Sequence, residues 1–322
     1  MEHVTIPYSG TLLVSHLAAY GLGVALDVAG IDAFVGHDPD SQSFDPVVSF
    51  AAGYDDARAA IRASAESVEW IVERDVEPGK TGNDRRSVIW ARASMDDDPE
   101  RLARIVAMRA ELAEEADRAP SPIAAMLLGG LGSPIAWGPE NVRTAHGATA
   151  LDGVLGNHTS DFVRGVLRPT RLAAAALDPD PFEGESRRTV PLDKTGWAPP
   201  GTPVDYVHQW LAALGLALLP VAHRQLEAST TPACWRRKQG RRGVTLPLLA
   251  TSVSVSRLRA LLQLPALVAF PGERDEPPPV HEAGILRSYG IDEVVVFERR
   301  NRSGAGSSVA FDFRRGERVA LR

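Results

Sequence analysis

The sequence of 322 residues contains one cysteine, Cys234. A single cysteine excludes an internal disulfide framework and any zinc site built on several cysteines. It also fits a reducing compartment, so we expect a cytoplasmic protein.

Motifs that carry catalysis or hold a cofactor are missing as well. No Gly-x-Ser-x-Gly elbow and no His-Glu-x-x-His pair occur, and the eight histidines are never three to five residues apart. The loop 78–82 lacks the glycine that a phosphate loop needs five residues before Gly79, because Arg74 occupies that position. We therefore expect no enzymatic activity, no metal ion and no bound cofactor.

Long uninterrupted apolar runs are also absent. Residues 8–26 contain no Asp, Glu, Lys or Arg, but His16, two serines and three glycines interrupt them. Residues 120–139 are equally free of these charges and are broken by four prolines and four glycines. Such broken runs favour buried core over membrane-spanning helices, so no membrane partner is expected.

Lysine is scarce, and the charge that is present is unevenly distributed. Arginine supplies 32 of the 35 cationic side chains, and the formal net charge of the chain is −6. Residues 1–222 hold 18 basic and 31 acidic side chains, a net −13, whereas residues 223–322 hold 17 and 10, a net +7. An acidic body with a basic C-terminal region indicates an anionic partner for one face of the protein.

The pattern of apolar residues predicts an α+β fold without a regular βαβ alternation, in an N-terminal domain 1–145 and a C-terminal domain 146–322. Predicted helices cover residues 11–28, 55–74, 99–112, 204–219 and 253–263. Short strands are expected at residues 4–8, 33–35, 47–50 and 88–91. The basic region predicts two β-hairpins, over residues 233–249 and 294–321.

The strongest local signal is a group of cations around the glycine turn of the first hairpin. A second group lies in the other hairpin. Arginine bonds phosphate through a planar fork and stacks on bases, so both groups predict nucleic-acid binding. The candidate contact residues are Trp235, Arg236, Arg237, Lys238, Gln239, Arg241, Arg242, Arg299, Arg300 and Arg302. Trp235 is expected either to stack on a base or to pack within the protein.

From His146 onward the order of elements resembles a known family. The segments that carry the resemblance are Gly156–Phe162, Trp210–Pro220, Trp235–Leu249, Val253–Leu258 and residues 290–299. This order is similar to that of the large-subunit proteins of type I CRISPR surveillance (Cascade) complexes, especially the small GSU-type branch (I-U or I-G). The candidate contact residues above come from charge and not from this resemblance.

The resemblance implies a non-catalytic, DNA-binding subunit of a crRNA-guided complex. Such a subunit helps read a short motif beside the target, steadies the displaced strand and docks a separate helicase-nuclease. Its partners would be crRNA, target DNA, the backbone subunits of the complex and the helicase-nuclease. Pairing with the guide would supply sequence specificity.

Two other classes of function remain open from the residues alone. An enzyme of an unfamiliar α+β fold could clamp an anionic small molecule with these arginines. His146, His158 or Asp161 would then be its catalytic groups. A scaffold protein could instead use the arginines to meet an acidic partner.

Overall fold

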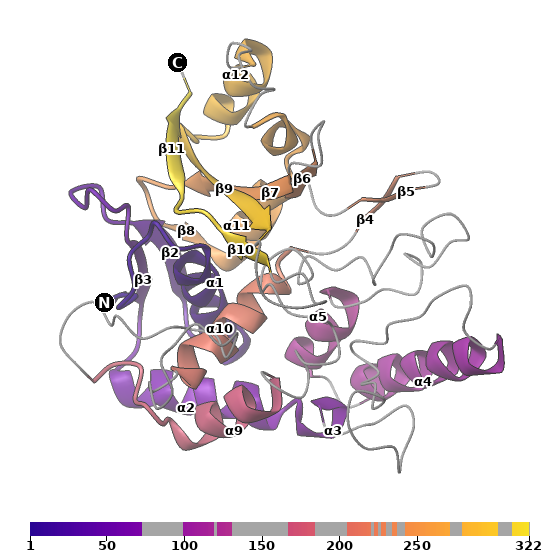
Figure 1. Cartoon of the computed structure of the whole chain (residues 1–322). Coiled ribbons are helices and arrows are strands. Elements are labelled where there is room, and N and C mark those ends of the chain that lie inside the picture. Colours follow the sequence, from indigo (N-terminus) through magenta and orange to yellow (C-terminus); the bar gives the residue numbers. More distant parts are fainter. Residues whose placement is uncertain are drawn as a thin grey trace.

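The computed structural model describes residues 1–72, 99–118, 121–130, 167–183, 205–219, 222–224, 227–229, 234–236, 242–270, 279–301 and 311–321. Helices and short strands alternate irregularly along these residues, and every strand pair among them is antiparallel (Figure 1). The protein therefore has the α+β fold that the sequence predicts.

The described helices are α1 (Leu13–Val28), α2 (Tyr54–Glu66), α3 (Glu69–Val72), α4 (Pro99–Arg118), α5 (Pro122–Gly130), α9 (Arg168–Ala176), α10 (Tyr206–Leu216), α11 (Val255–Leu262), the 3-10 helix η6 (Pro265–Ala269) and α12 (Val280–Ser288). The described strands are β1 (Glu2–Thr5), β2 (Ala33–His37), β3 (Pro46–Phe50), β4 (Ala222–Arg224), β5 (Glu227–Ser229), β6 (Cys234–Arg236), β7 (Arg242–Leu248), β8 (Val253–Ser254), β9 (Glu293–Asn301), β10 (Phe311–Phe313) and β11 (Glu317–Ala320). The predicted strand 88–91 lies outside the described residues.

The first sheet has the strand order β1-β3-β2-β8. Its last strand comes from far along the chain, because Val253 of β8 lies opposite Val35 of β2. Helix α1 packs on β2 and β3, and its residues from Ser15 to Leu26 are all buried. A helix without charge over this stretch can be buried on every side, which explains the apolar composition of residues 8–26.

The second sheet has the order β10-β9-β7-β6, and β11 also pairs with β9. Both predicted hairpins are confirmed, because β6 pairs with β7 and β9 pairs with both β10 and β11. This C-terminal sheet lies above α1 and α10 in Figure 1. A separate pair, β4 with β5, stands apart from both sheets.

Glycines let α1 and α10 cross at very short distance. A Cβ atom added to Gly21 would lie 1.7 Å from the carbonyl oxygen of Leu211, and one added to Gly215 would lie 2.0 Å from that of Leu17. No real Cβ fits at such separations, so each helix needs a glycine where it crosses the other. This contact joins the two halves of the chain at the centre of the fold.

The helix predicted over residues 55–74 is interrupted. Helix α2 ends at Glu66, and the short helix α3 begins at Glu69. The hydroxyl group of Ser64 donates to the carbonyl oxygen of Ile61 at 2.6 Å, and that of Ser67 donates to Ser64 at 3.0 Å. Serine hydroxyls that bond nearby carbonyls compete with the helical pattern, which accounts for the break.

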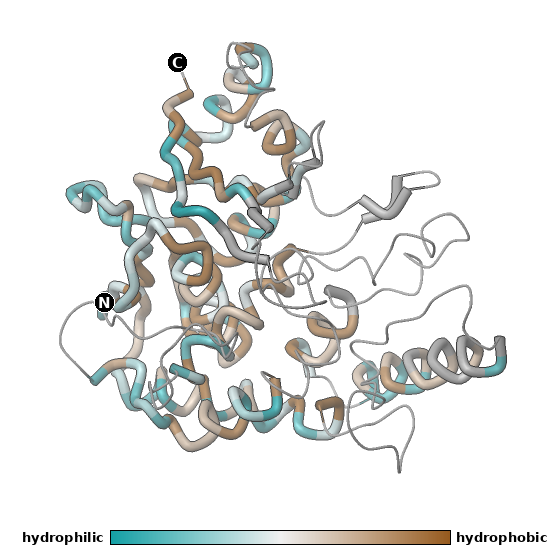
Figure 2. The backbone as a smooth tube through the Cα atoms, in the orientation of Figure 1, coloured by the Kyte–Doolittle hydropathy of each residue, from teal (hydrophilic) through white to brown (hydrophobic). Residues whose placement is uncertain are grey.

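Side chains from both expected domains pack in one cluster of buried residues, which extends from Ile6 to Leu321. The expected boundary at residues 145 and 146 lies outside the described part of the chain. Figure 2 shows the hydrophobic residues gathered on the central elements and hydrophilic ones toward the periphery. None of the helices in the described ranges is both long and apolar enough to cross a membrane.

Candidate nucleic-acid interface

Three candidate arginines lie in one row across the C-terminal sheet. Arg236 of β6 is the register partner of Arg242 of β7, and Arg242 is the partner of Arg299 of β9. Directly opposite positions on antiparallel strands lie on the same face of a sheet, about 5 Å apart. The sheet thus brings together two basic groups that are more than 50 residues apart in sequence, a relation that the sequence alone left open.

The arginine row lies at the end of the face that builds the core. Two residues along each strand, Val244 and Phe297 face one another and are 2% and 0% exposed. The ring of Phe297 contacts that of His16 on α1 edge-on, with 5.4 Å between the centroids. Side chains alternate between the faces of a strand, so positions two residues apart share a face. One face of this sheet therefore changes from packed apolar residues to arginines within two residues.

Trp235 lies on the opposite face from this row and is buried, with 3% of its surface exposed. Its register partner is Gly243, and a Cβ atom on Gly243 would lie 2.3 Å from the indole atom Cζ2. The indole of Trp235 therefore occupies the space that a side chain at position 243 would need. Of the two roles expected for Trp235, this burial supports packing, and we leave the residue out of the contact set.

The remaining candidates are placed only in part. Arg300 is the register partner of Asp312 on β10, one position beyond the arginine row. Arg237, Lys238, Gln239, Arg241 and Arg302 lie outside the described residues. The chain enters and leaves 237–241 at Arg236 and Arg242, so the connection that carries Arg237, Lys238, Gln239 and Arg241 starts and ends at the row.

Two acidic residues flank the row. Glu298 lies between Phe297 and Arg299 on β9, on the face of Trp235, and its carboxylate is 3.9 Å from the guanidinium of Arg314. Asp312 stands opposite Arg300. No register position within the row itself is acidic, because all three positions hold arginine.

A second polar cluster, which the sequence did not reveal, lies in the core where α10 begins. The carboxylate of Asp205 accepts hydrogen bonds from the Tyr8 hydroxyl and the His208 ring, both at 2.8 Å, and from the His208 backbone amide at 3.0 Å. Burial opposes ionisation of Asp205, but the bonds and charge of His208 and the Tyr8 hydroxyl outweigh it and hold its pKa well below the usual range. Asp205 caps α10, so an aspartate just before the helix was the available sequence signal.

A pair of buried histidines joins the two sheets. Nδ1 of His37 accepts from the backbone amide of Leu249 at 3.0 Å, so its Nε2–H donates to Nδ1 of His16, also at 3.0 Å. Nε2 of His16 in turn donates to the carbonyl oxygen of Gly10 at 2.6 Å. This chain of bonds requires both rings to be neutral, and burial accordingly lowers the pKa of His16 to about 4 and that of His37 well below 6.5.

Both clusters form buried hydrogen bonds between segments that are distant in sequence. His16 and His208 are buried, at 0% and 1% exposure, and the ring of each is hydrogen-bonded within the core. In the ranges that the structure describes, no three His, Cys, Asp or Glu side chains are grouped to hold a metal ion. The residues of the alternative enzyme hypothesis, His146, His158 and Asp161, lie outside those ranges.

Comparison with protein-family models and with curated proteins finds no match to this chain.

Proposed function

We propose that this protein is a non-catalytic, DNA-binding subunit of a crRNA-guided CRISPR surveillance complex in the cytoplasm. The basic end of its C-terminal sheet contacts the phosphate backbone of target DNA beside the guide-paired segment. Base pairing with crRNA supplies most of the sequence specificity, and the protein reads backbone and flanking motif.

The assignment to a CRISPR complex rests on the resemblance of the chain from His146 onward, and the structural observation that supports contact with DNA is the register of Arg236, Arg242 and Arg299. Like charges at directly opposite positions destabilise a sheet, by roughly 0.2–1 kcal/mol for each pair. A row of three arginines therefore has an electrostatic cost that a polyanion would offset. Phosphates of a nucleic-acid strand supply such an anion at short, regular spacing.

The acidic remainder of the chain suits protein partners better than nucleic acid. Residues 1–222 carry a net −13, which repels phosphate and attracts basic protein surfaces. In this proposal, residues of the acidic body meet the backbone subunits and the helicase-nuclease. The basic end of the C-terminal sheet then contacts the DNA.

Replacement of Arg236, Arg242 and Arg299 by alanine tests the proposal in the assembled complex. Affinity for target DNA, measured by fluorescence anisotropy at several salt concentrations, should fall on the order of a hundredfold at low salt. The slope of log affinity against log salt should flatten by roughly 2–3, because each phosphate contact contributes about 0.9.

A matched control keeps the same change in net charge and moves it elsewhere. Arg62, Arg118 and Arg287 are exposed and lie on helices outside the C-terminal sheet, and their joint replacement by alanine should leave affinity and slope nearly unchanged. Equal losses in the two triple variants would show that bulk charge alone governs binding. An unchanged slope in the row variant, within a complex that still contains crRNA, would overturn the proposal.

A further inference from the structure

The arginine row continues onto the edge strand β10, where it ends in an aromatic residue. Phe313 of β10 is the register partner of Arg299. The full row therefore holds Arg236, Arg242, Arg299 and Phe313 on four adjacent strands. Neighbouring strands lie about 4.8 Å apart, so the four positions span roughly 14 Å. This end of the sheet thus combines three basic positions with an aromatic one in a single line.

A second phenylalanine lies on the same face of β10. Phe311 precedes Phe313 by two residues, and its register partner is Asn301 of β9. Residues two apart along a strand share a face, so both phenylalanine positions lie on the face of the arginine row. Asp312 alternates to the opposite face, together with its partner Arg300. None of the positions named on the row face is acidic.

The opposite face of the sheet is covered by the protein itself. Trp235 is buried there, and the hydroxyl group of Thr245 donates to the carbonyl oxygen of Phe270, at the end of η6, at 2.6 Å. The 3-10 helix η6 packs on both β6 and β7. In the described ranges, β9 is the only element that packs extensively on β10. A partner of this end is therefore expected on the row face and not on the face of Trp235.

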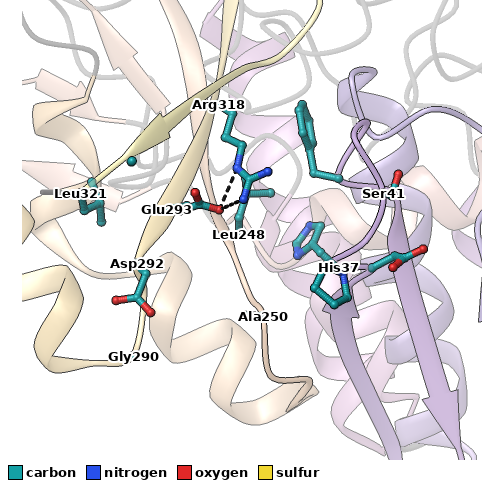
Figure 3. Close-up of a pocket in the computed structure, with 13 residues that line it drawn as sticks. His37, Ser41, Leu248, Ala250, Gly290, Asp292, Glu293, Arg318 and Leu321 are labelled. Atoms are coloured by element: carbon teal, nitrogen blue, oxygen red, sulfur yellow. Dashed lines mark hydrogen bonds and ion pairs between the residues drawn. The ribbon is translucent and has the colours of Figure 1, made fainter.

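The start of β9 offers no comparable surface, although an arginine lies there too. Figure 3 shows an open pocket of about 380 Å³ at this end, between the chain after β2 and the strands β9 and β11. The guanidinium of Arg318 lines this pocket and donates to the Glu293 carboxylate through Nε at 2.7 Å. An anion therefore meets no free arginine among the described residues that line the pocket.

Arginines beside aromatic residues on a sheet suit an unpaired nucleic-acid strand. Guanidinium groups bond phosphates, and bases stack on aromatic rings. Some four-stranded sheets bind RNA by stacking unpaired bases on aromatic side chains of one face. In a duplex the base faces already stack on one another, at a spacing of about 3.4 Å. Positions 311 and 313 are roughly 7 Å apart along β10, twice that spacing, which successive bases of an extended single strand can span.

We propose that the row face at β10 binds an unpaired nucleic-acid strand. Its bases stack on Phe311 and Phe313, and its phosphates lie against the arginines of the row. This binding mode rests on the proposed function and makes it more specific, because the nucleic acid that the basic end contacts is single-stranded at that point. A phenylalanine side chain has no hydrogen-bonding group, so the contact accepts every base.

Fluorescence anisotropy with the full chain tests this preference for a single strand. The probes are a labelled strand of about fifteen thymidines and a hairpin duplex of the same length. The single strand should bind at least roughly tenfold more tightly than the duplex. Tighter binding of the thymidine strand than of a uridine strand identifies displaced DNA as the source, and equal or weaker binding identifies guide RNA. A duplex that binds as tightly as the single strand overturns the proposal.

A pair of conservative substitutions tests the two stacking positions. Phe311→Leu with Phe313→Leu keeps apolar side chains, and with them any packing role, but removes both aromatic faces. Binding of the thymidine strand should weaken about thirtyfold, whereas its salt dependence should stay the same, because no phosphate contact is lost. Phe311→Tyr with Phe313→Tyr retains both aromatic faces and should bind within about threefold of the unaltered protein.

Two further variants separate stacking from charge. Tyr54 and Tyr289 are 38% and 50% exposed and lie outside the C-terminal sheet, so Tyr54→Leu with Tyr289→Leu should bind both probes normally. The row variant, with Arg236, Arg242 and Arg299 replaced by alanine, should lose affinity for both probes. If it does so while the leucine variant binds thymidines as tightly as the tyrosine control, the stacking is overturned and the proposed function stands. An unaffected row variant overturns both.

Cross-linking locates the strand without any substitution. A thymidine strand that carries 5-iodouracil cross-links to nearby aromatic side chains on irradiation, and trypsin releases residues 303–314 as one peptide. This peptide contains Phe311 and Phe313 and should carry the cross-link in the unaltered protein, as mass spectrometry can determine. Cross-links found only in other peptides overturn the proposal, even where the leucine variant fails to fold.

Discussion

The two ends of strand β9 manage charge in opposite ways. At its start, Glu293 forms an ion pair with Arg318 of the neighbouring strand β11. At its end, Arg299 is the register partner of Arg242, and the row continues to Arg236. The first end balances its charge within the sheet, and the second accumulates charge of one sign.

The ion pair at the start of β9 stabilises the sheet itself, whereas the arginines at its end are suited to bind an anion. Balanced charges on adjacent strands need no binding partner to offset them. Charges of one sign raise the free energy of the isolated sheet and lower it when an anion arrives. The following predictions test each side of the contrast, from the largest expected effect to the smallest.

The largest effect should come from the scaffold of the basic end. In Gly243→Ala, the new Cβ would lie 2.3 Å from the backbone oxygen of Phe297 and from the Trp235 ring. The backbone of a paired strand can move only at a large energetic cost. We therefore expect a loss of about 3 kcal/mol in the free energy of unfolding, measured by urea denaturation. Gly284→Ala on α12, where the added atom meets nothing within 4 Å, is the control and should be neutral or slightly stabilising. Equal stability of the two variants would show that β6, β7 and β9 are not packed as described.

The second effect is a loss of unfolding free energy at low pH, caused by the buried pair His16 and His37. The folded chain keeps His16 neutral, with a pKa of about 4, whereas the unfolded chain binds the proton near pH 6.5. This contribution is complete above pH 6.5 and is lost as pH falls toward 4. From His16 alone we expect about 2 kcal/mol to disappear between pH 7.5 and pH 5, measured by denaturation at each pH, and His37, whose pKa is also lowered, adds to the loss.

Variants at two histidines isolate this contribution. His16→Gln removes the titrating ring from the buried pair and should flatten the pH dependence. His281→Gln, at an exposed position on α12, should keep it. The same slope in both variants would mean that the histidine pair does not carry the effect.

The third effect is a gain in stability. The register positions on both sides of Arg242 hold arginine, so Arg242→Thr removes the middle charge of the row and inserts a residue that favours strands. Unfolding free energy should rise by up to about 1 kcal/mol, while DNA affinity of the assembled complex falls. A variant that loses stability along with affinity would indicate that the row is already compensated within the protein.

The smallest effect should come from the balanced pair. Glu293 and Arg318 are partly exposed, at 30% and 47% of their side chains, so solvent screens their attraction. Glu293→Gln should cost about 0.5 kcal/mol or less. A double-mutant cycle with Arg318→Gln measures the coupling, and a value well above 1 kcal/mol would show that the two ends differ less than we infer.

Local signals in the sequence predicted the helices and strands, but they did not predict which strands pair with each other or in which register. The long uncharged stretch at α1 and the glycine turns of the basic hairpins were sufficient to place helix and strands. The register that aligns Arg236 with Arg299 depends on β7 lying between their strands, and its long-range part is the pairing of Arg242 with Arg299, more than 50 residues away. Period-2 alternation alone would have separated Trp235 from its arginine neighbours, because adjacent strand residues point to opposite faces.

The buried polar residues were harder to predict for a related reason. Nothing near His37 indicates a bond to Leu249, more than 200 residues away, and nothing near Tyr8 indicates Asp205. Burial and hydrogen-bond partners determine what such groups do, and both arise only when distant segments pack. The pocket is another product of this packing, since its two walls come from opposite ends of the chain.

The pairing of β8 with β2 has a consequence for any attempt to work with part of the chain. A fragment that stops before α10 would leave β2 with an unpaired edge and would bare the face of α1 that its crossing partner covers. An open strand edge beside exposed apolar surface is a template for aggregation. Each half of the chain thus covers the apolar surface and strand edge that the other half would expose. We therefore expect complementary fragments to be soluble when they are co-expressed and to aggregate when either is expressed alone.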